Sequence, residues 1–299
     1  MRRMAYFLAS AVTAALASTA VGTPATAAES ISTTGASGTQ FGAVVAKRGT
    51  ETFAQAQQRA DTTYGGLPIS RVFYSGAPPA WPGNAGYSGR DVVVSFKYVP
   101  EQVIAGTYDR AIRSWFANAP TDRDIYWSYF HEPEDNIEAG ETTAANYRAA
   151  FAHVAALAAL ANNPRLHATL ILMCWTLGPA SGRHWHNYYA GPASVEDVAF
   201  DCYNYAGRSG SYVDPSKLFS RVVQFGINTG IPWGIAEVGS IKINSDTTGD
   251  GRAAWLRSVG QFLAGKAIFA NYFDVKLSTD YRLLDAPSEA AWREVVTTY

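Results

Sequence analysis

The sequence predicts an α/β protein with a single domain, a (β/α)8 TIM barrel. Short apolar runs recur eight times, and most of them alternate with helical patterns, which is typical of a closed parallel barrel. The length of 299 residues suits one large barrel better than two domains. A doubly wound open sheet is the second choice, but the sequence has no glycine-rich phosphate turn of the Rossmann or P-loop kind.

Residues 1–28 have the pattern of a secretory signal peptide. Met1-Arg2-Arg3 is basic, the stretch 6–17 is apolar and small, and 25–28 offers the small residues of a cleavage site. The apolar stretch is too short, and too often interrupted by Ser and Thr, to span a membrane. We therefore expect a secreted, extracellular protein that does not enter a membrane.

Residues 29–40 are rich in Ser, Thr, Gly and Ala and predict a flexible leader, so we expect the barrel domain over 41–299, acting as a monomer. The net charge is −1 and no basic patch is present, which excludes nucleic acid as a partner. Aromatic residues make up 13% of the chain and favour flat apolar surfaces for sugars, although a large core also uses aromatic side chains.

The first half of the domain predicts four strands and two helices. Phe41 starts a short buried strand, and Gly65-Gly66 ends the helix that follows it. An aromatic run from Asp124 stops at a Pro, which is typical of a strand that meets a loop. The expected strands cover 41–45, 69–74, 91–97 and 124–130, and the expected helices cover 51–63 and 101–116.

The second half repeats this alternation. Apolar residues from Tyr147 to Leu157 recur at helical spacing, and Thr142 or Thr143 can cap this helix. The run 167–175 is apolar throughout, as expected for a buried strand. The expected strands cover 167–175, 195–203, 232–238 and 267–273, and the expected helices cover 143–160, 214–228, 252–263 and 287–297.

Two glutamates lie where predicted strands end, which is the active-site face of a parallel barrel. Glu132 follows the aromatic run directly, although it could equally cap the next loop. Glu237 lies between Ala and Val in an apolar strand, where a carboxylate is costly to bury without a partner or a function. An ion pair with Arg71 is the alternative explanation for Glu237. On the fourth and seventh strands, the two glutamates should face each other across the barrel mouth.

A pair of carboxylates in an aromatic-lined cleft is suited to cleaving a glycosidic bond. One group donates a proton to the leaving oxygen, and the other attacks the anomeric carbon. We expect them about 5.5 Å apart, the separation of retaining enzymes. The acid needs a raised pKa, which burial among Phe130, Trp127 and Trp175, with repulsion from the second carboxylate, would supply.

Three short motifs resemble those of the family 26 glycoside hydrolases of clan A. They are His-Glu at 131–132, Asp-Cys-Tyr at 201–203 and Glu-Val-Gly at 237–239. Members of that family are (β/α)8 enzymes, mostly endo-β-mannanases, with some xylanases and mixed-linkage glucanases. The separation of the two glutamates along the chain is also similar to that of the family.

The resemblance implies a role for each matching residue. Glu132 would be the catalytic acid/base, and Glu237 the catalytic nucleophile. His131 would contact the sugar or tune the site, and Tyr203 would position the nucleophile. Asp201, from the same motif as Tyr203, joins the expected substrate-binding residues.

Two departures from the family's pattern bear on the substrate. The stretch 133–136 reads Pro-Glu-Asp-Asn where the mannanases usually have a Gly and an aromatic cluster, and 271–274 reads Asn-Tyr-Phe-Asp where a Trp is common. We expect a polysaccharide or oligosaccharide substrate, of β-mannan type or another hemicellulose. Xylan, mixed-linkage glucan and arabinan are alternatives, and so is a non-catalytic sugar-binding barrel, although such a protein has no need of two facing carboxylates.

Aromatic side chains on the loops are the expected platforms for sugar rings, although each could equally serve in packing. The candidates are Trp81, Trp175, Trp185, Tyr188, Tyr205 and Tyr272. Esterase and metalloprotease functions are disfavoured because their main motifs, G-x-S-x-G and H-E-x-x-H, do not occur in the sequence.

No cofactor or metal ion is expected. His184 and His186 lack a third ligand at suitable spacing, and the stretch 244–251 lacks the terminal Glu of a calcium loop, which favours a capped turn before a helix. Cys174 and Cys202 are the two cysteines of the chain. Because adjacent parallel strands rarely hold the geometry of a disulfide, the sequence favours free thiols over a bridge.

Overall fold

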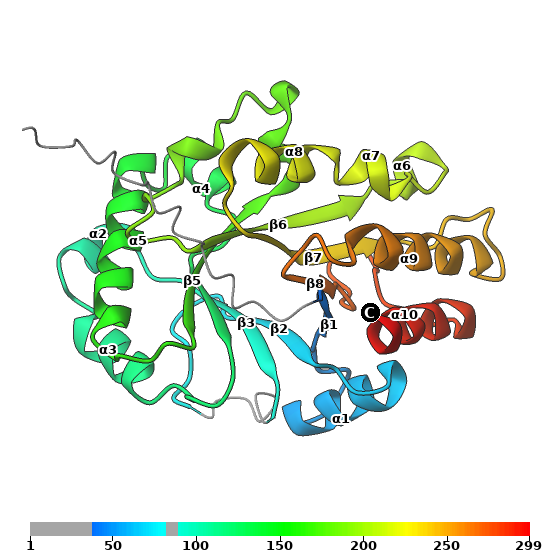
Figure 1. Ribbon diagram of the computed structural model, residues 1–299, viewed down its shortest axis with the longest axis horizontal. Helices are drawn as coiled ribbons and strands as arrows, with labels where there is room; N and C mark the ends of the chain where they lie inside the picture. The colour runs from blue at the N-terminus through cyan, green and yellow to red at the C-terminus, as the bar shows by residue number, and fades with distance from the viewer. Residues whose placement is uncertain (1–37, 82–88) are drawn as a thin grey trace, which may run out of the picture. The chain divides into compact units, whose positions relative to one another are not determined.

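The computed structural model describes residues 38–81 and 89–299. The predicted signal peptide and most of the predicted leader lie outside these residues. The strands form one closed parallel barrel in chain order, with β1 beside β8, which confirms the predicted fold and excludes the open sheet (Figure 1). The strands are β1 (Gln40–Val44), β2 (Ile69–Phe73), β3 (Asp91–Phe96), β4 (Ile125–Tyr129), β5 (Leu166–Met173), β6 (Asp197–Asn204), β7 (Trp233–Ser240) and β8 (Phe269–Tyr272).

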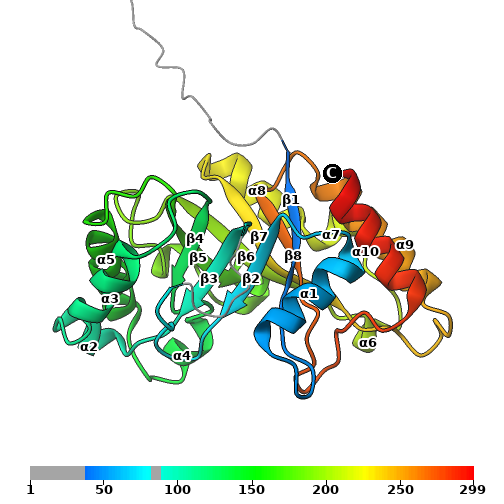
Figure 2. The ribbon, with the colours of Figure 1, turned by 90° about the horizontal axis from the view of Figure 1, so that it is seen from below.

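The helices alternate with the strands, and neighbours pack on one another: α1 on α10 and α10 on α9, α2 and α3 on α5 (Figure 2). The helices are α1 (Phe53–Tyr64), α2 (Pro100–Ile104), α3 (Asp109–Ala117), α4 (Glu134–Glu138), α5 (Ala144–Ala159), α6 (Ala206–Ser209), α7 (Pro215–Leu218), α8 (Ser220–Thr229), α9 (Asp250–Leu263) and α10 (Ala286–Thr298). Short 3-10 helices are η2 (Cys174–Leu177), η3 (Pro179–Ser181) and η4 (Trp185–Asn187).

Local sequence signals explain several helix ends. Thr52 and Gln55 form a reciprocal capping box before α1, and Thr143 caps α5 as predicted. The helix predicted over 101–116 is two helices, α2 and α3, because Gly106 between them has a φ of 75°, which a helix cannot contain. Two other short helices, α4 and α6, were not predicted from the sequence.

The core of the barrel becomes polar toward the C-terminal ends of the strands. Ile69 and Ala199 belong to a small buried cluster that is separate from the larger core between strands and helices. Two residues further along the same strands, and therefore on the same face, lie Arg71 on β2 and Asp201 on β6. Both polar side chains are buried, so the mouth of the barrel holds charged groups above an apolar base.

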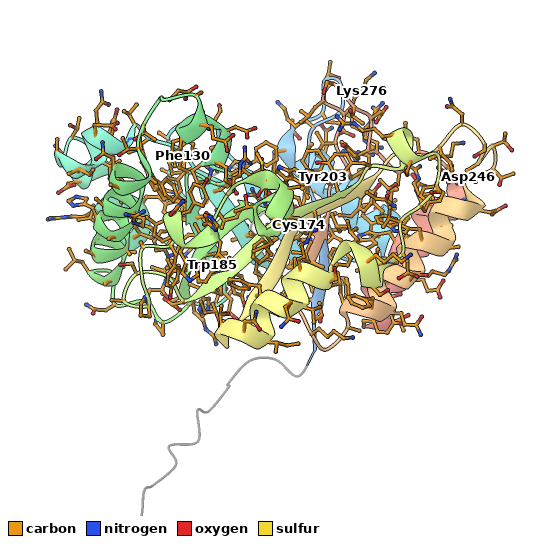
Figure 3. All side chains as sticks on the ribbon, turned by 90° about the horizontal axis from the view of Figure 1, so that it is seen from above. Phe130, Cys174, Trp185, Tyr203, Asp246 and Lys276 are labelled. Atoms are coloured by element: carbon orange, nitrogen blue, oxygen red, sulfur yellow. A yellow bond between two sulfur atoms is a disulfide. The ribbon has the colours of Figure 1, made fainter. Side chains whose placement is uncertain are left out.

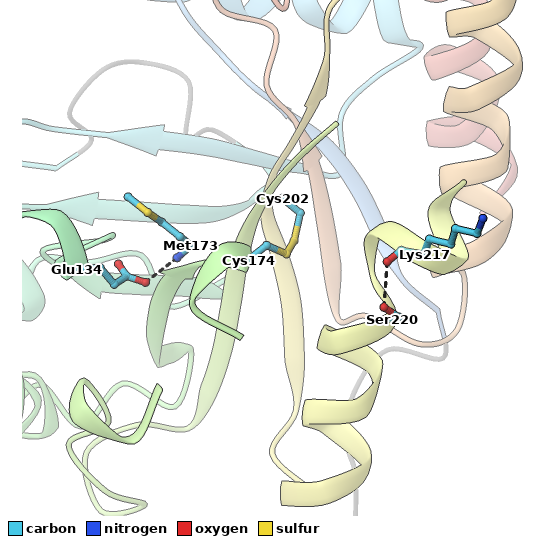
Figure 4. The surroundings of a disulfide bond; sticks show 6 residues. All are labelled: Glu134, Met173, Cys174, Cys202, Lys217 and Ser220. Carbon is cyan, nitrogen blue, oxygen red and sulfur yellow. Dashed lines mark hydrogen bonds between the residues drawn. A yellow bond between two sulfur atoms is a disulfide. The ribbon is translucent and has the colours of Figure 1, made fainter. Parts of the chain in front are cut away.

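Cys174 and Cys202 form a disulfide, so the expectation of free thiols is wrong. The reason is that Cys174 is not in a strand: β5 ends at Met173, and Cys174 begins η2. Its departure from the sheet brings the two Cα atoms to 5.0 Å, within the range of disulfides. The bridge joins the segment after β5 to β6, two residues before the end of that strand (Figure 4).

Candidate active site

Glu237 lies on β7 opposite Asp201 on β6, with Tyr203 two residues further along β6. The Tyr203 hydroxyl donates a hydrogen bond of 2.5 Å to Oε2 of Glu237. Gly239 makes room for this contact, since a Cβ at that position would lie 3.2 Å from the Tyr203 ring. Burial and the neighbouring Glu237 raise the pKa of Tyr203, so this phenol remains a hydrogen-bond donor.

Arg71 holds the other oxygen of Glu237. Its Nη2 lies 3.2 Å from Oε1, and the guanidinium is completely buried. The ion pair considered as an alternative from the sequence is therefore present, but it accompanies the Tyr203 hydrogen bond instead of replacing it. Arg71 Nη1 also donates to the Val72 carbonyl and to Ser95 Oγ, which fixes the guanidinium plane.

Glu132 lies in a strained turn after β4. The φ angles of Phe130 and Glu132 are 51° and 48°, a left-handed conformation that costs side-chain-bearing residues about 1–3 kcal/mol each. Two backbone hydrogen bonds hold the turn, from Phe130 N to the Phe96 carbonyl and from Glu132 N to the Ile171 carbonyl. Strain maintained by neighbouring strands is frequent at functional sites.

The surroundings of Glu132 favour its protonated form. Burial, followed by repulsion from Glu237 and then from Glu134, raises the pKa of Glu132 to about 8. Asp201 interacts with the Glu132 carboxyl group, and burial raises the pKa of Asp201 as well. Within the described residues, the Asp201 carboxyl group has no hydrogen-bond donor apart from the carboxyl group of Glu132. Two carboxyl groups in such contact need at least one proton between them.

His131 is neutral and held in one orientation. Its Nδ1 lies 2.9 Å from Ser95 Oγ, which already accepts a hydrogen bond from Arg71. We infer that the Ser95 hydroxyl donates to Nδ1, which places the imidazole proton on Nε2. Burial, with the nearby charges of Arg71 and Lys97, lowers the pKa of His131 to about 3. The ring therefore offers one N–H donor.

A pocket of about 410 Å³ opens beside these groups. Glu132, Asp201 and Tyr203 form part of its lining, together with the aromatic side chains of Trp175 and Tyr205. Trp175 is 48% exposed and Tyr205 is 57% exposed, so both can offer a ring face to a ligand. Figure 3 shows Cys174, Trp175's neighbour in η2, near Tyr203.

Other aromatic candidates serve in packing. Tyr272 is fully buried, and its hydroxyl donates to the carbonyls of Ser240 and Tyr281, so it cannot be a sugar platform. Tyr188 is also buried. The prediction for Tyr272 is wrong because this residue of β8 faces the layer between strands and helices, which a strand pattern does not distinguish from the mouth. The prediction for Tyr188 is wrong because this loop residue, directly after η4, packs into the same core.

Trp81, Trp185 and Trp127 do not join the pocket beside Glu132. The Trp81 and Trp115 ring centroids lie 4.8 Å apart, and the Trp185 and Phe225 rings pack edge to face. Trp127 stacks with Phe151 in the outer core, so the predicted role of Trp127 in desolvating the acid is wrong.

The loop before α9 is a capped turn. The Asp246 carboxylate, labelled in Figure 3, accepts hydrogen bonds from the Tyr212 hydroxyl and from the backbone N–H groups of Gly249, Gly251 and Arg252.

In the part of the chain that the structure describes, no three His, Cys, Asp or Glu side chains are grouped to hold a metal ion. Within that same part, no helix is long and apolar enough to cross a membrane.

Sequence reasoning missed two contributors to the site. Ser95 orients His131, and Glu134, which is completely buried, adds to the charge around Glu132. The available signal for Ser95 was a polar residue within the apolar run of β3. For Glu134, it was the departure from the family pattern after Pro133.

Neither a protein-family model nor a curated protein matches the sequence. Among solved structures, the family 26 domain of an endo-β-mannanase/endo-β-glucanase from Prevotella bryantii matches with a TM-score of 0.59 at 12% identity, over 88% of this chain and 90% of that one. A family 26 β-mannanase from Bacteroides ovatus gives 0.58 at 11% identity, over 88% and 89%. A family 128 endo-β-1,3-glucanase from Amycolatopsis mediterranei gives 0.55 at 16% identity, over 86% and 99%.

At these low identities, the likeness establishes the fold alone. The resemblance to family 26 of clan A, predicted from three short motifs, is confirmed at that level. The chain has the (β/α)8 fold of glycoside hydrolases whose names associate them with mannan and glucan, those of family 26 among them.

Proposed function

We propose that this protein is a retaining glycoside hydrolase that cleaves a polysaccharide by double displacement. The observation that carries the proposal is the contrast between two carboxyl groups at one barrel mouth. Glu237 is held as a carboxylate between Arg71 and Tyr203, whereas Glu132 lies among other carboxyl groups that favour its protonated form. A nucleophile needs the first environment and a general acid needs the second.

In the first step, Glu237 attacks the anomeric carbon while Glu132 donates its proton to the leaving glycosidic oxygen. The hydrogen bond from Tyr203 and the ion pair with Arg71 orient the attacking carboxylate. His131, with its proton on Nε2, offers a donor to a sugar hydroxyl. The product is a glycosyl ester on Glu237.

In the second step, Glu132, now ionised, removes a proton from water, and the water attacks the anomeric carbon of the ester. Glu237 leaves as a carboxylate, and Arg71 and Tyr203 stabilise the charge that returns to it. Two inversions at the anomeric carbon give net retention.

The substrate we propose is a β-linked polysaccharide, of β-mannan type or another hemicellulose. The names of the similar structures support this class, since they mention β-mannan and β-1,3-glucan activities. The two exposed rings beside Glu132, Trp175 and Tyr205, suit the flat faces of sugar residues. We also propose that the protein is secreted, which the disulfide supports because such bonds persist in oxidising compartments.

A screen for reducing ends tests the proposal. The purified protein is incubated with mannan, xylan, mixed-linkage glucan, β-1,3-glucan and arabinan, with Glu237→Ala as the blank. We expect release from at least one polymer, absent in the variant, and retained anomeric configuration by NMR at early times. Release of the inverted anomer would exclude double displacement. Binding of a polymer without any release would instead support the sugar-binding alternative.

A further inference from the structure

Glu134 is a buried carboxyl group two residues after the proposed acid. It is the first residue of α4 and is completely inaccessible to solvent, although the helix itself is at the surface. A buried carboxyl group is costly unless it is paired or hydrogen-bonded, so its contacts deserve an explanation. Glu134 belongs to the stretch 133–136, where the sequence departs from the family 26 pattern.

The Oε1 atom of Glu134 holds the loop that follows β5. It accepts a hydrogen bond from Met173 N at 2.9 Å (Figure 4). It also accepts one from Thr176 Oγ1 at 2.6 Å. These two donors flank Cys174 and Trp175, so Glu134 fixes both ends of the segment that carries the exposed Trp175 ring. The disulfide ties the same segment to β6 from the other side.

Arg183 adds a second link between α4 and this loop. Its side chain, 8% exposed, forms ion pairs with Asp135 and Glu138 on α4. Its Nη1 also lies 3.2 Å from the sulfur of Met173. The loop from 174 to 187 therefore depends on α4 for much of its position, with Glu134 as its buried contact.

We propose that Glu134 is a positioning residue that fastens the Trp175 segment to the turn bearing Glu132, so that the sugar platform and the proton donor keep a fixed distance. The effect on catalysis rests on the proposed function, whereas the hold on the loop does not. Because Glu134 accepts both hydrogen bonds through one oxygen, glutamine can preserve the hold and alanine cannot.

The charge of Glu134 has a second effect. Charged and titratable groups that interact with it are Glu132, Asp201, Arg183, Tyr147 and Tyr188. A negative charge at Glu134 opposes ionisation of Glu132. Burial raises the pKa of Glu134 itself, whereas the hydrogen bonds from Thr176 and Met173 and the nearby Arg183 guanidinium favour its charged form. Replacing Glu134 by glutamine should therefore let Glu132 lose its proton at lower pH.

Limited trypsin digestion tests the hold without reference to activity. Cleavage after Arg183 is followed on reduced gels, since the disulfide keeps the two fragments joined, and identified by a new N-terminus at His184. We expect Glu134→Ala to be cut about tenfold faster or more, Thr176→Val less so, and Glu134→Gln nearly as slowly as wild type. The matched control is Glu141→Gln, which replaces an exposed carboxylate on the segment that follows α4.

Wild-type cleavage rates in both Glu134→Ala and Thr176→Val would overturn the proposal. Should Glu134→Ala fail to fold, Thr176→Val still decides, because it removes one donor to the same oxygen. The trypsin cleavage rates can be compared even if the protein cleaves no glycan. Failure of the proposed function is therefore distinguished from failure of the proposed role of Glu134.

Kinetics on the cleaved glycan then test the link to Trp175. We expect Glu134→Ala to raise KM more than it lowers kcat. The loss of kcat/KM in the double variant with Trp175→Ala, expressed as a free energy, should be smaller than the sum of the two single losses, since both changes disturb one platform. In Glu134→Gln, the basic limb of kcat/KM should move to lower pH with KM within about twofold of wild type. Additive losses with an unmoved basic limb would contradict the positioning role.

Discussion

Glu132 and Glu237 are the same residue type at the same mouth of one barrel, yet their direct contacts differ. Glu237 lies within a regular strand and touches a buried cation and a phenol donor. Glu132 lies in a strained turn outside the strands, and its main electrostatic neighbours are other carboxyl groups. The proposed chemical role of each carboxyl group therefore rests on its neighbours more than on its position on the barrel.

The two glutamates also differ in what controls them: direct contacts fix the position of Glu237, whereas burial and charge act on the ionisation of Glu132. Arg71 connects the two sides, since it pairs with Glu237 and, through Ser95, orients His131 beside Glu132. Glu237, the proposed nucleophile, is fixed by direct contacts to both of its oxygens. Glu132, the proposed acid, is instead governed by burial and by charges that oppose its ionisation. Changes to the two glutamates should consequently differ in kind as well as in size.

The largest effect is expected for Glu237→Ala. Removal of the nucleophile should lower kcat/KM by about 10⁴-fold or more, because no other carboxylate lies between Arg71 and Tyr203 in the described site. Azide should restore part of the activity on an activated aryl glycoside and give a product of inverted configuration. Glu141→Gln serves as the control. Residual activity near the wild-type level would remove Glu237 from the nucleophile role.

Glu132→Ala should depend on the leaving group. With poor leaving groups, kcat should fall by about 10²–10⁴-fold, whereas activated aryl glycosides, which need no protonation, should lose much less in the first step. The comparison uses a series of aryl glycosides of increasing leaving-group pKa. An equal loss across the series would show that Glu132 does not act as the acid, and the distinction between the two glutamates would then fail.

Tyr203→Phe should have an intermediate effect. It removes the 2.5 Å hydrogen bond to Glu237 and leaves the ring in place, so we expect kcat/KM to fall about 10–100-fold, as for loss of a hydrogen bond to a charged group. Thermal unfolding of the variant provides the control for folding. A wild-type rate would mean that Arg71 alone is sufficient to orient the nucleophile.

The sequence was sufficient to predict the barrel and the place of both glutamates at its mouth, whereas their catalytic roles stay a prediction. Apolar runs report the strands directly, and a lone carboxylate such as Glu237 stands out in one of them. The left-handed turn at Phe130 and Glu132 could not be predicted, since residues with side chains adopt it only when neighbouring strands impose it. The alternation pattern also gave no means of telling that Tyr272 faces away from the mouth.

The disulfide illustrates a different limit. The argument against it treated Cys174 as part of a strand, and an error of two residues in the predicted strand end reversed the conclusion. Boundaries are the least reliable part of a sequence-based assignment. The proposed role of Glu134 was inaccessible for a related reason, because its two donors, Met173 and Thr176, lie on either side of that same boundary.

The smallest expected effect is on the free energy of unfolding. Its sign should be opposite for replacement of Glu132 and of Glu237. The pKa of Glu132 is about 8 in the folded protein, above its ordinary value of 4.5. Below pH 4.5, both the folded and the unfolded chain hold this proton. As pH rises from there toward 8, the unfolded chain releases the proton and the folded chain retains it, so the stability of the folded protein falls.

Glu132→Gln removes this penalty without changing the shape of the side chain. Relative to wild type, the variant should gain on the order of 2 kcal/mol in unfolding free energy at pH 7.5, and less at pH 4.5, as measured by urea unfolding at both values. Glu237→Gln should instead lose stability, because it breaks the pair with the buried Arg71 guanidinium. A stabilised Glu237→Gln would show that the two carboxyl groups share one environment, and the assignment of separate roles would no longer stand.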